Sequence, residues 1–489
     1  MDRLRKDLFS DVLNEGGSDV SKPLSYKTML AVAAGEFFGG GAFNIINFLY
    51  PGFLAMAVGL PPHLAGLVIL IARIFDAVID PPMGVISDKL RVRFGTRRKS
   101  LLISAPLLVL ALFLMFFPYS NSDLTVRFFL ALMSYIFFCA VQSSVMIPYY
   151  SLASEITEDY TERARMTTLR LGFSIFASIV CVALPGVIVN LFDGNTGYMA
   201  MSLIFGAVFM ICVGITGLFA KEGIPPPEKA ETFSMRDLIQ PLKLKTFRQY
   251  LYIFLSCQIT MAVMSALFFF YVDFYFTRDI TAQGGTSMVG LIGAALMFGM
   301  QIVALPFYLW MVKKTSKTAV YILGALIWIV GALFLFVLPA NASPVFLYIL
   351  AAVLGFGISG PGLIPHAIFA DVVDVGNLRF GKRAAGIFGG VSNFTIQLGQ
   401  AVGVSAVMAG IGLAVFVEQD IREGAELVTS QSLSAQNAII WIMALAPLAF
   451  MSFGIFICTR YKLNKERHAM VIEALDGTDE EKAAVLESL

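Results

Sequence analysis

Two aspartates, Asp76 and Asp80, lie inside the apolar stretch 63–86, which is long enough to cross a membrane, and Arg73 precedes them. On a helix, residues four apart share one face about one turn apart, and Arg73 falls on the same side. A charge at mid-bilayer costs at least ~2.5–3.5 kcal/mol, and two neighbouring carboxylates also repel each other. Because a bound cation or proton relieves both costs, and hard cations such as Na⁺ prefer oxygen ligands, we predict an H⁺ or Na⁺ site at Asp76 and Asp80. The alternative is a structural ion pair with Arg73, in which Asp80 only caps the turn before Pro81.

Other polar residues also occur at the depth of apolar stretches. Glu36 lies next to Gly39-Gly40-Gly41, where small residues allow close helix approach, and an isolated ionisable group at this depth is a candidate for solute binding. His366 is a candidate for solute binding or proton relay because histidine titrates near neutral pH; a satisfied core histidine is the alternative. Further candidate donors to a solute, or links between helices, are Asn44, Gln142, Asn393 and Gln397.

Long apolar helices must position these residues. The chain has 489 residues, of which 57% are apolar and 14% charged, whereas a soluble domain carries about 25% charged residues. A transmembrane helix needs ~20 mainly apolar residues to cross ~30 Å of hydrocarbon. Twelve stretches are long enough, near 28–57, 63–86, 100–118, 127–153, 166–192, 198–220, 248–276, 286–311, 318–338, 345–370, 385–416 and 437–458. We therefore predict an all-α membrane protein with twelve transmembrane helices.

Basic residues alternate between the connecting segments. Lys and Arg gather in the N-terminal segment, in every second loop and in the segment after Arg460, while the intervening loops hold Arg127, Arg278 and Arg422. Because cytoplasmic loops carry the excess of Lys and Arg, we expect both termini in the cytoplasm and the chain in the cell membrane. This arrangement requires an even number of helices, which supports twelve.

The twelve stretches divide into two halves. A polar segment with three consecutive prolines separates the sixth stretch from the seventh. IPYYSLASEITEDYTERAR at 147–165 is similar to IPHAIFADVVDVGNLRFGKR at 364–383, although any loop after a membrane helix tends to carry such acidic and basic residues. Parallel six-helix repeats with a substrate site between them are a transporter architecture, so we expect two six-helix bundles with pseudo-twofold symmetry. The expected divisions are a cytoplasmic segment at 1–26, an N-terminal bundle at 27–220, a linker at 221–247, a C-terminal bundle at 248–459 and a cytoplasmic tail at 460–489.

The segment RIFDAVIDPPMGVISDKLRVRFGTRRKS at 73–100 resembles the signature of the glycoside-pentoside-hexuronide:cation symporters. This family is a branch of the major facilitator superfamily that includes the melibiose carrier. The similarity extends to IPYYSL in the fourth helix, to the Arg170 segment in the fifth and to ADVVD at 370–374 in the tenth. The resemblance implies the major facilitator fold, symport, and a cation site at Asp76 and Asp80.

The resemblance adds one residue to the cation site and shows one departure. Ser143 falls where the melibiose carrier has a hydroxyl near its cation, so we expect it at this site; a serine that bonds its own helix backbone is the alternative. Many family members carry a polar residue, often Asn, immediately before the second aspartate, and this chain has Ile79 there. Because an oxygen ligand is lost, Na⁺ and H⁺ both stay open as the coupling ion.

By the family pattern, the solute binds between the two halves. The pattern includes acidic residues in helices one and four, but the corresponding positions fall near Gly40 and at Met146. Tyr150 matches the aromatic residue of helix four, and Arg170 matches the arginine of helix five. In helix eleven, Gln397 stands where the family often has a lysine.

The predicted pocket is therefore less charged than that of a disaccharide carrier. Glu36 lies about one turn from Gly40 and could replace the missing carboxylate, and Arg73 is a further candidate to contact the solute. A different sugar, an acidic sugar held by Arg170, or a more apolar solute would all fit.

Charged residues at the cytoplasmic helix ends are candidates for a gate. The resemblance implies that Asp88 pairs with Arg97 and Arg98 and that such pairs latch the closed halves. Further candidates for the same latch are Glu155, Asp371 and Asp374.

These observations favour cation-coupled symport of a sugar, glycoside or sugar acid by alternating access of two bundles. Within transport, the alternative is a cation-coupled carrier of a lysophospholipid or of another amphipathic or organic-acid solute. A transport-like sensor is the alternative of another class, although the tail leaves no room for a signalling domain. We do not expect an enzyme, because the HExxH, GxSxG and Walker motifs are missing. We expect no cofactor and no nucleic-acid partner, and a monomer in the lipid bilayer.

Overall fold

The computed structural model describes residues 25–119, 123–154, 156, 160–192, 195–220, 240–277, 287–340, 342–380, 385–414, 416–417, 431–475 and 477–488. Among these residues, twelve helices are long and apolar enough to cross a membrane, which confirms the predicted number. The first six are α2 (Tyr26–Gly52) with the π-helical turn η1 (Phe53–Ala57), α3 (Pro62–Phe94), α4 (Arg98–Met115), α5 (Leu124–Ser154), α6 (Tyr160–Leu191) and α7 (Thr196–Phe219). After the short η3 (Pro241–Lys243), the second six are α8 (Lys245–Tyr271) with η4 (Val272–Phe276), α9 (Met288–Lys314), α10 (Lys317–Val337), α11 (Pro344–Phe380), α12 (Ala385–Leu413) and α13 (Leu433–Arg460).

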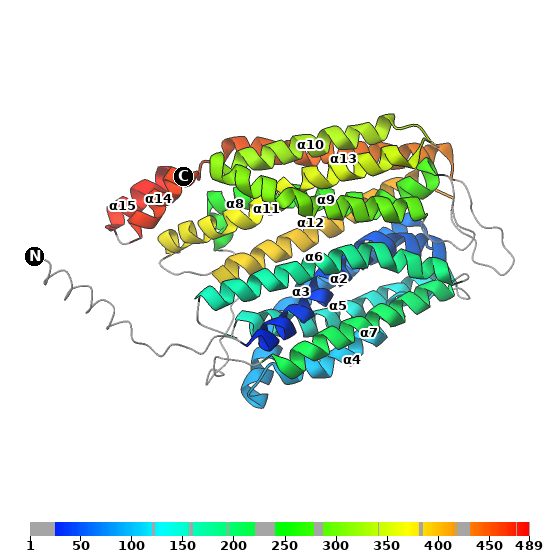
Figure 1. Ribbon diagram of the computed structural model, residues 1–489, viewed down its shortest axis with the longest axis horizontal. Helices are drawn as coiled ribbons and strands as arrows, with labels where there is room; N and C mark the ends of the chain where they lie inside the picture. Colours follow the sequence, from blue (N-terminus) through cyan, green and yellow to red (C-terminus); the bar gives the residue numbers. More distant parts are fainter. Residues whose placement is uncertain are drawn as a thin grey trace, which may run out of the picture.

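The helices form two bundles that lie side by side. Figure 1 shows α2 to α7 in one group and α8 to α13 in the other, with all of the long helices running in roughly the same direction. The first helix of each half ends in the same way, because α2 continues into the π-helical turn η1 and α8 into η4. This correspondence is what two structural repeats would produce.

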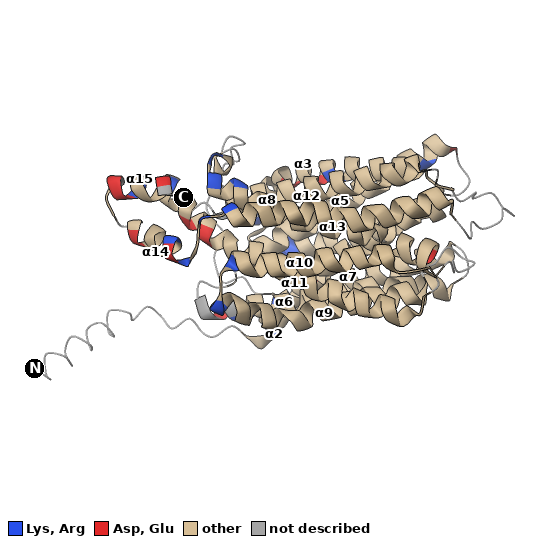
Figure 2. Ribbon diagram, turned by 90° about the horizontal axis from the view of Figure 1, so that it is seen from above, with Lys and Arg blue, Asp and Glu red and all other residues tan. Residues whose placement is uncertain are grey.

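Charge separates the two ends of the molecule. Figure 2 shows Lys and Arg gathered at the end where α14 (Lys465–Ala474) and α15 (Asp479–Ser488) lie, which we call the basic end. We call the other end, where η1 meets α3, the distal end. Its Arg127 donates hydrogen bonds to the carbonyls of Val58 and Gly59 at 2.7 and 3.0 Å and so closes the link between the first two membrane helices.

Among the described residues, the two halves touch each other mainly through three helix pairs, α2 with α8, α3 with α12 and α6 with α9. Near the distal end, small residues allow the backbones to come together: a Cβ on Gly66 would lie 3.1 Å from the carbonyl oxygen of Ser405, and one on Gly412 would lie 3.3 Å from the backbone nitrogen of His63. Contacts of this kind hold the distal ends of the two bundles close to each other.

Two helices are longer than the sequence predicts. Helix α3 runs eight residues beyond position 86, and α11 runs ten residues beyond position 370. Hydropathy marks only the part of a helix that matches the hydrocarbon, and the additional turns carry charged residues that hydropathy excludes. Gly95 then ends α3 with a positive φ of 71°, a conformation that glycine adopts without steric cost.

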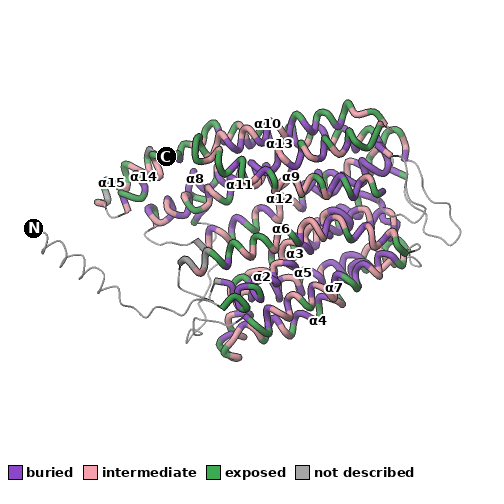
Figure 3. The backbone as a smooth tube through the Cα atoms, in the orientation of Figure 1, coloured by how far each residue is buried: buried purple, intermediate pink, exposed green. Residues whose placement is uncertain are grey.

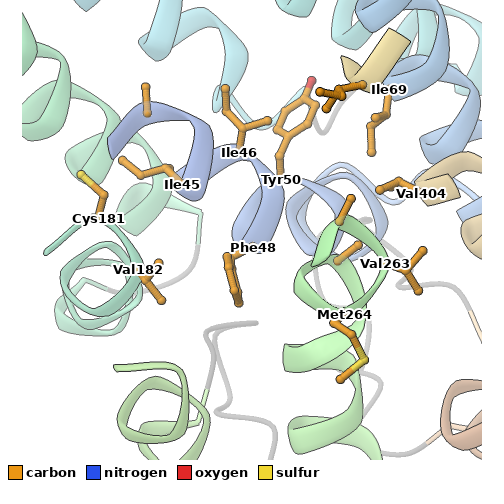
Figure 4. Packing of buried hydrophobic residues seen from close by; sticks show 14 of the residues in the cluster. Ile45, Ile46, Phe48, Tyr50, Ile69, Cys181, Val182, Val263, Met264 and Val404 are labelled. Atoms are coloured by element: carbon orange, nitrogen blue, oxygen red, sulfur yellow. The ribbon is translucent and has the colours of Figure 1, made fainter. Parts of the chain in front are cut away.

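The middle of α2 packs against both halves of the molecule. Its glycines allow the close approach to α6 that the sequence suggests, since a Cβ on Gly40 would lie 2.9 Å from Ser174 Cα. Figure 4 shows how side chains from α2, α3, α6, α8 and α12 surround this region; those labelled are Ile45, Ile46, Phe48, Tyr50, Ile69, Cys181, Val182, Val263, Met264 and Val404. Helix α2 is therefore well placed to respond to a movement of either half.

The outside of the bundle is apolar as well as the core. Large apolar side chains are exposed on peripheral helices, for example Ile103 on α4 and Phe334 and Val337 on α10. Figure 3 shows these outward-facing sides as exposed, with the buried positions turned toward the interior. An exposed apolar surface of this extent belongs to a multi-pass membrane protein.

The segment after α13 forms structure that the sequence did not lead us to expect. Helices α14 and α15 pack against the basic end of α11, with Val471 and Ala474 buried in the contact. Each helix is short and largely polar, so the hydropathy pattern predicts only a polar tail for this segment and no helices.

Candidate functional site

A cavity of about 740 Å³ lies between the two halves. It is lined from one half by α2, α3, α5 and α6 and from the other by α8, α9, α11 and α12. Most of the polar residues that the sequence singles out reach this cavity, namely Asn44, Arg73, Asp80, Gln142, Ser143, Tyr150, His366, Asn393 and Gln397. The helical repeat therefore brings together side chains that are up to 353 residues apart in the sequence.

The two aspartates and Ser143 meet at the wall of the cavity. Ser143 Oγ donates a hydrogen bond to Asp80 Oδ1 at 2.6 Å and lies 3.4 Å from Asp76 Oδ1. Asp80 lines the cavity, whereas Asp76 is only 1% exposed and lies behind the wall. The serine of α5 therefore connects both carboxylates of α3 and does not merely bond its own helix.

Arg73 lies beside the two aspartates but forms no close salt bridge with either of them in the described residues. Its Nη1 is 3.8 Å from Asp76 Oδ2, longer than a normal hydrogen bond, and that oxygen has no hydrogen-bond partner among the described residues. The guanidinium lies over the ring of Phe43, 4.7 Å from its centroid. Two buried charges, Arg73 and Asp76, and the half-buried Asp80 thus lie together with a net charge of −1.

The donor set at the aspartates suits a hard cation or a proton. Two carboxylates and the Ser143 hydroxyl supply oxygens, and Gln397 of α12 lies beside Asp80 and carries a buried side-chain oxygen without a partner among the described residues. Ile79 is half-buried and is not among the lining residues, so it contributes no ligand. In the part of the chain that the structure describes, no group of three or more His, Cys, Asp or Glu side chains could hold a metal ion, so a metal here would rely on this mixed set.

Glu36 and Arg170 are tied to each other at the edge of the cavity. Arg170 Nη2 lies 3.0 Å from Glu36 Oε2, and its Nε donates to Tyr149 Oη at 3.2 Å. The guanidinium also lies over the rings of Tyr149 and Tyr150, at 5.2 and 5.5 Å. Neither Glu36 nor Arg170 is a lining residue, whereas Tyr150 is, so the tyrosine links this ion pair to the cavity.

The two positions that carry sugar-binding carboxylates in the family pattern, near Gly40 and at Met146, hold no carboxylate in this chain. Gly40 faces Ser174 of α6, where no larger side chain fits unless α2 and α6 separate. Met146 lines the cavity and contributes an apolar surface. Asp80 is the one carboxylate among the described lining residues.

The second half contributes amide side chains that sequence reasoning did not single out. Besides Asn393 and Gln397, the cavity is lined by Gln258 of α8, Gln301 of α9 and Gln400 of α12. His366 lies against Phe254, with ring centroids 5.1 Å apart. A lone amide in an apolar helix is unusual, and this could have singled out Gln258 and Gln301 as candidates. Sequence alone, however, does not show which face of α8 or α9 meets the other half.

The proposed gating residues form contacts within each half. Arg97 donates to Ser87 at 2.8 Å and to Asp88 at 2.6 Å. Arg98 donates to the carbonyl oxygens of Gly217, at 2.9 Å, and Leu218 at the end of α7.

In the other half, Asp371 accepts from Lys317 at 2.5 Å, and Asp374 lies 3.2 Å from Nε2 of His468 in α14. The printed contacts of these carboxylates are therefore with their own half and with the segment after α13, and their gating role stays a prediction. Glu155 lies outside the described residues.

Comparisons with known proteins agree with this architecture. A family model described as "MFS/sugar transport protein" matches residues 32–465. The uncharacterized symporter YjmB of Bacillus subtilis (strain 168) is 27% identical, covering 94% of this chain and 96% of its own. The glucuronide carrier protein homolog of Escherichia coli (strain K12) is 24% identical, covering 94% and 97%.

Among solved structures, a bacterial homolog of the human lysosomal transporter Spinster, in an inward-facing and unoccupied conformation, superposes with a TM-score of 0.64. It is 12% identical and covers 91% of this chain and 98% of its own, so the likeness concerns the fold. The fold, the match along nearly the whole chain and the symporters among its relatives identify a transporter and not an enzyme. The chain belongs to the glycoside-pentoside-hexuronide:cation symporter family of the major facilitator superfamily.

Proposed function

We propose that this protein couples the movement of Na⁺ or H⁺ to symport of a sugar, glycoside or sugar acid by alternating access. The observation that carries the proposal is the pair of carboxylates joined by Ser143, with Asp80 on the cavity wall and Asp76 behind it. An ion held between these carboxylates lies next to the solute, so each ligand changes the electrostatic environment of the other. This is the physical basis of a coupling free energy between two sites.

The charge of the site favours a neutral solute. Arg73, Asp76 and Asp80 together carry −1, while Glu36 and Arg170 cancel each other. One bound monovalent cation brings the total charge of these three residues to zero, and a neutral solute does not change that total. A sugar acid would need a second cation, because a net charge inside the membrane is costly. We therefore favour a neutral sugar or glycoside, moved with one cation.

The lining of the cavity fits a polyhydroxylated solute. Carboxamides and serine hydroxyls from both halves can donate and accept hydrogen bonds, and aromatic residues such as Phe43 and Phe254 offer flat apolar faces. Basic loops mark the cytoplasmic side by the positive-inside rule, so we place the basic end in the cytoplasm of the cell membrane. The contacts near the distal end would then close the cavity toward the outside, with the chain working as a monomer.

Uptake into proteoliposomes tests the function directly. A panel of neutral glycosides, hexuronates and a lysophospholipid would be offered under an imposed Na⁺ gradient or an imposed pH gradient. We expect a neutral glycoside to accumulate with one of these gradients, and to do so faster when the interior is made negative with potassium and valinomycin, because one positive charge moves per cycle. Accumulation of the lysophospholipid alone would favour the amphipathic-solute alternative, and no accumulation of any solute would remove support for symport.

The amide side chains of the second half provide a test of solute binding. Replacing Gln258 or Gln301 by Leu is expected to raise the KM for the solute roughly three- to tenfold, the value of one lost hydrogen bond, with little change in the half-saturating ion concentration. Gln249→Leu is the matched control, because Gln249 of α8 does not line the cavity and its amide donates to the backbone oxygen of Arg460. If both Leu variants keep the wild-type KM, these amides do not contact the solute.

A further inference from the structure

A second, much smaller cavity of about 20 Å³ lies beside Arg73. It shares Asn47, Arg73, Ala262 and Gln400 with the large cavity. Among its other lining residues, Ile69 and Val404 lie one turn closer to the distal end than Arg73 and Gln400. The small cavity is therefore next to the guanidinium on the side turned away from Asp80.

Two buried polar atoms at this cavity lack hydrogen-bond partners. Arg73 is 5% exposed and its Nη2 has no partner among the described residues; Tyr135 is fully buried and its Oη has none either. The two side chains are close enough to interact electrostatically, with the guanidinium carbon 5.9 Å from the centroid of the Tyr135 ring, although neither Arg73 Nη2 nor Tyr135 Oη makes a geometrically complete hydrogen bond among the described residues. Leaving a buried donor without a partner is costly, and native proteins satisfy such groups with protein atoms or ordered water.

The size and chemistry of the cavity select one kind of occupant. A water molecule needs about 10–15 Å³ of accessible space and two to four polar partners. Arg73, Tyr135, Asn47 and Gln400 supply such partners around a space of the right size. The guanidinium disfavours a cation there, and the net negative charge of Arg73 with its two aspartates disfavours an anion.

We propose that this cavity is a binding site for an ordered water molecule that joins Arg73 Nη2 to Tyr135 Oη. The water gives the guanidinium a partner on the side away from Asp76 and so keeps Nη1 at 3.8 Å from the Asp76 carboxylate. Tyr135 is then a positioning residue: it acts through the water on Arg73 and leaves Asp76 available to a coupling ion. This consequence rests on the proposed coupling function, whereas the water site itself does not.

Hydroxyl-radical labelling by X-ray radiolysis tests the water site without any transport assay. Radicals form from water, so a buried tyrosine is labelled quickly only if an ordered water contacts it. Tyr271 and Tyr321 are matched controls, because both are fully buried and their hydroxyls bond to protein atoms. In the full-length protein in nanodiscs, we expect Tyr135 to be labelled several-fold faster than either control. Equal rates for the three tyrosines would overturn the water site.

The variant Ala401→Val sharpens the labelling test, because Ala401 lines the small cavity and added methyl groups would displace its contents. Labelling of Tyr135 should then fall to the rate of the controls. If Tyr135 is still labelled at the fast wild-type rate in Ala401→Val, the radicals do not come from a water molecule in this cavity. If Ala401→Val does not fold, the comparison of tyrosines in the wild-type protein decides the matter alone.

The positioning role is tested by Tyr135→Phe, with Tyr50→Phe as its control. The two tyrosine rings are 5.0 Å apart and equally buried, but the Tyr50 hydroxyl lies 3.4 Å from the Ala131 carbonyl and does not line the small cavity. Without its partner, Arg73 moves toward Asp76 and competes with the coupling ion. We expect the half-saturating Na⁺ or H⁺ concentration to rise roughly fivefold in Tyr135→Phe, with an unchanged KM for the solute, and neither to change in Tyr50→Phe.

An unchanged ion requirement in Tyr135→Phe would overturn the positioning role even if the labelling result stands. Failure of the wild-type protein to accumulate any solute would instead count against the proposed coupling function, and the labelling comparison would still decide whether the water is present.

Discussion

Replacing Asp76 by Asn is expected to abolish accumulation of solute against a gradient while the protein still folds. Asn has nearly the same shape as Asp, but it carries no charge and takes up no proton at neutral pH. The site would then hold Asp80 and Arg73 with no net charge, and a cation would gain nothing by entering it. Uptake driven by an ion gradient should fall to the level reached without a gradient, as measured in proteoliposomes.

Asp123→Asn is the control for this substitution, because Asp123 is an exposed residue at the start of α5. A second measurement is the thermal denaturation of purified protein at increasing Na⁺ concentration and at different pH values. The wild-type protein and the control should be stabilised by the coupling ion through mass action, and Asp76→Asn should not respond. Accumulation at the wild-type level in Asp76→Asn would assign the aspartate pair a structural role.

Replacing Glu36 by Gln is expected to cause the largest loss of stability among single substitutions near the cavity. The side chains of Glu36 and Arg170 are 12% and 18% exposed, so removal of one partner leaves a mostly buried charge without compensation. Breaking such a pair typically costs roughly 3–5 kcal/mol. Helices α2 and α6 meet at this pair, so the melting temperature of the detergent-solubilised protein should fall clearly.

A double-mutant cycle separates the ion pair from the packing around it. Glu36→Gln together with Arg170→Gln removes both charges, and the double variant should be more stable than the sum of the two single effects predicts. The control is Arg248→Gln, which removes an exposed guanidinium near the start of α8, so its loss should cost less than about 1 kcal/mol. If the stability losses of Glu36→Gln and Arg170→Gln are additive, the two side chains do not stabilise the protein through each other.

Much of the fold could be predicted, because the hydropathy pattern alone determines the number and the approximate positions of the membrane-spanning helices. The twelve apolar stretches became twelve helices, and the largest differences concern the ends of α3 and α11, where the helix continues beyond the hydrocarbon. The segment after α13 was read as a tail because helices α14 and α15 are short and polar, and only their contact with α11 makes them stable.

The candidate site could be predicted in part. Helical periodicity put Asp76, Asp80 and Arg73 on one side of α3, and the resemblance added Ser143. The meeting of Glu36 with Arg170 could not be predicted, because the two residues are separated by 134 positions and either could have faced the cavity alone. Gln258 and Gln301 were missed for a similar reason, since sequence does not show how α8 and α9 are rotated.

The sequence by itself determined that this is a twelve-helix membrane protein with two carboxylates one turn apart in its second span. These features follow from local chemistry: the free energy of apolar residues in lipid and the repeat of the helix. Only the tertiary structure decided that Asp80 faces the cavity while Asp76 lies behind it, that Arg170 is paired with Glu36, and that Arg73 and Tyr135 share a small polar cavity. Such relations depend on how helices rotate and pack against one another, and that packing is set jointly by residues spread over the whole chain.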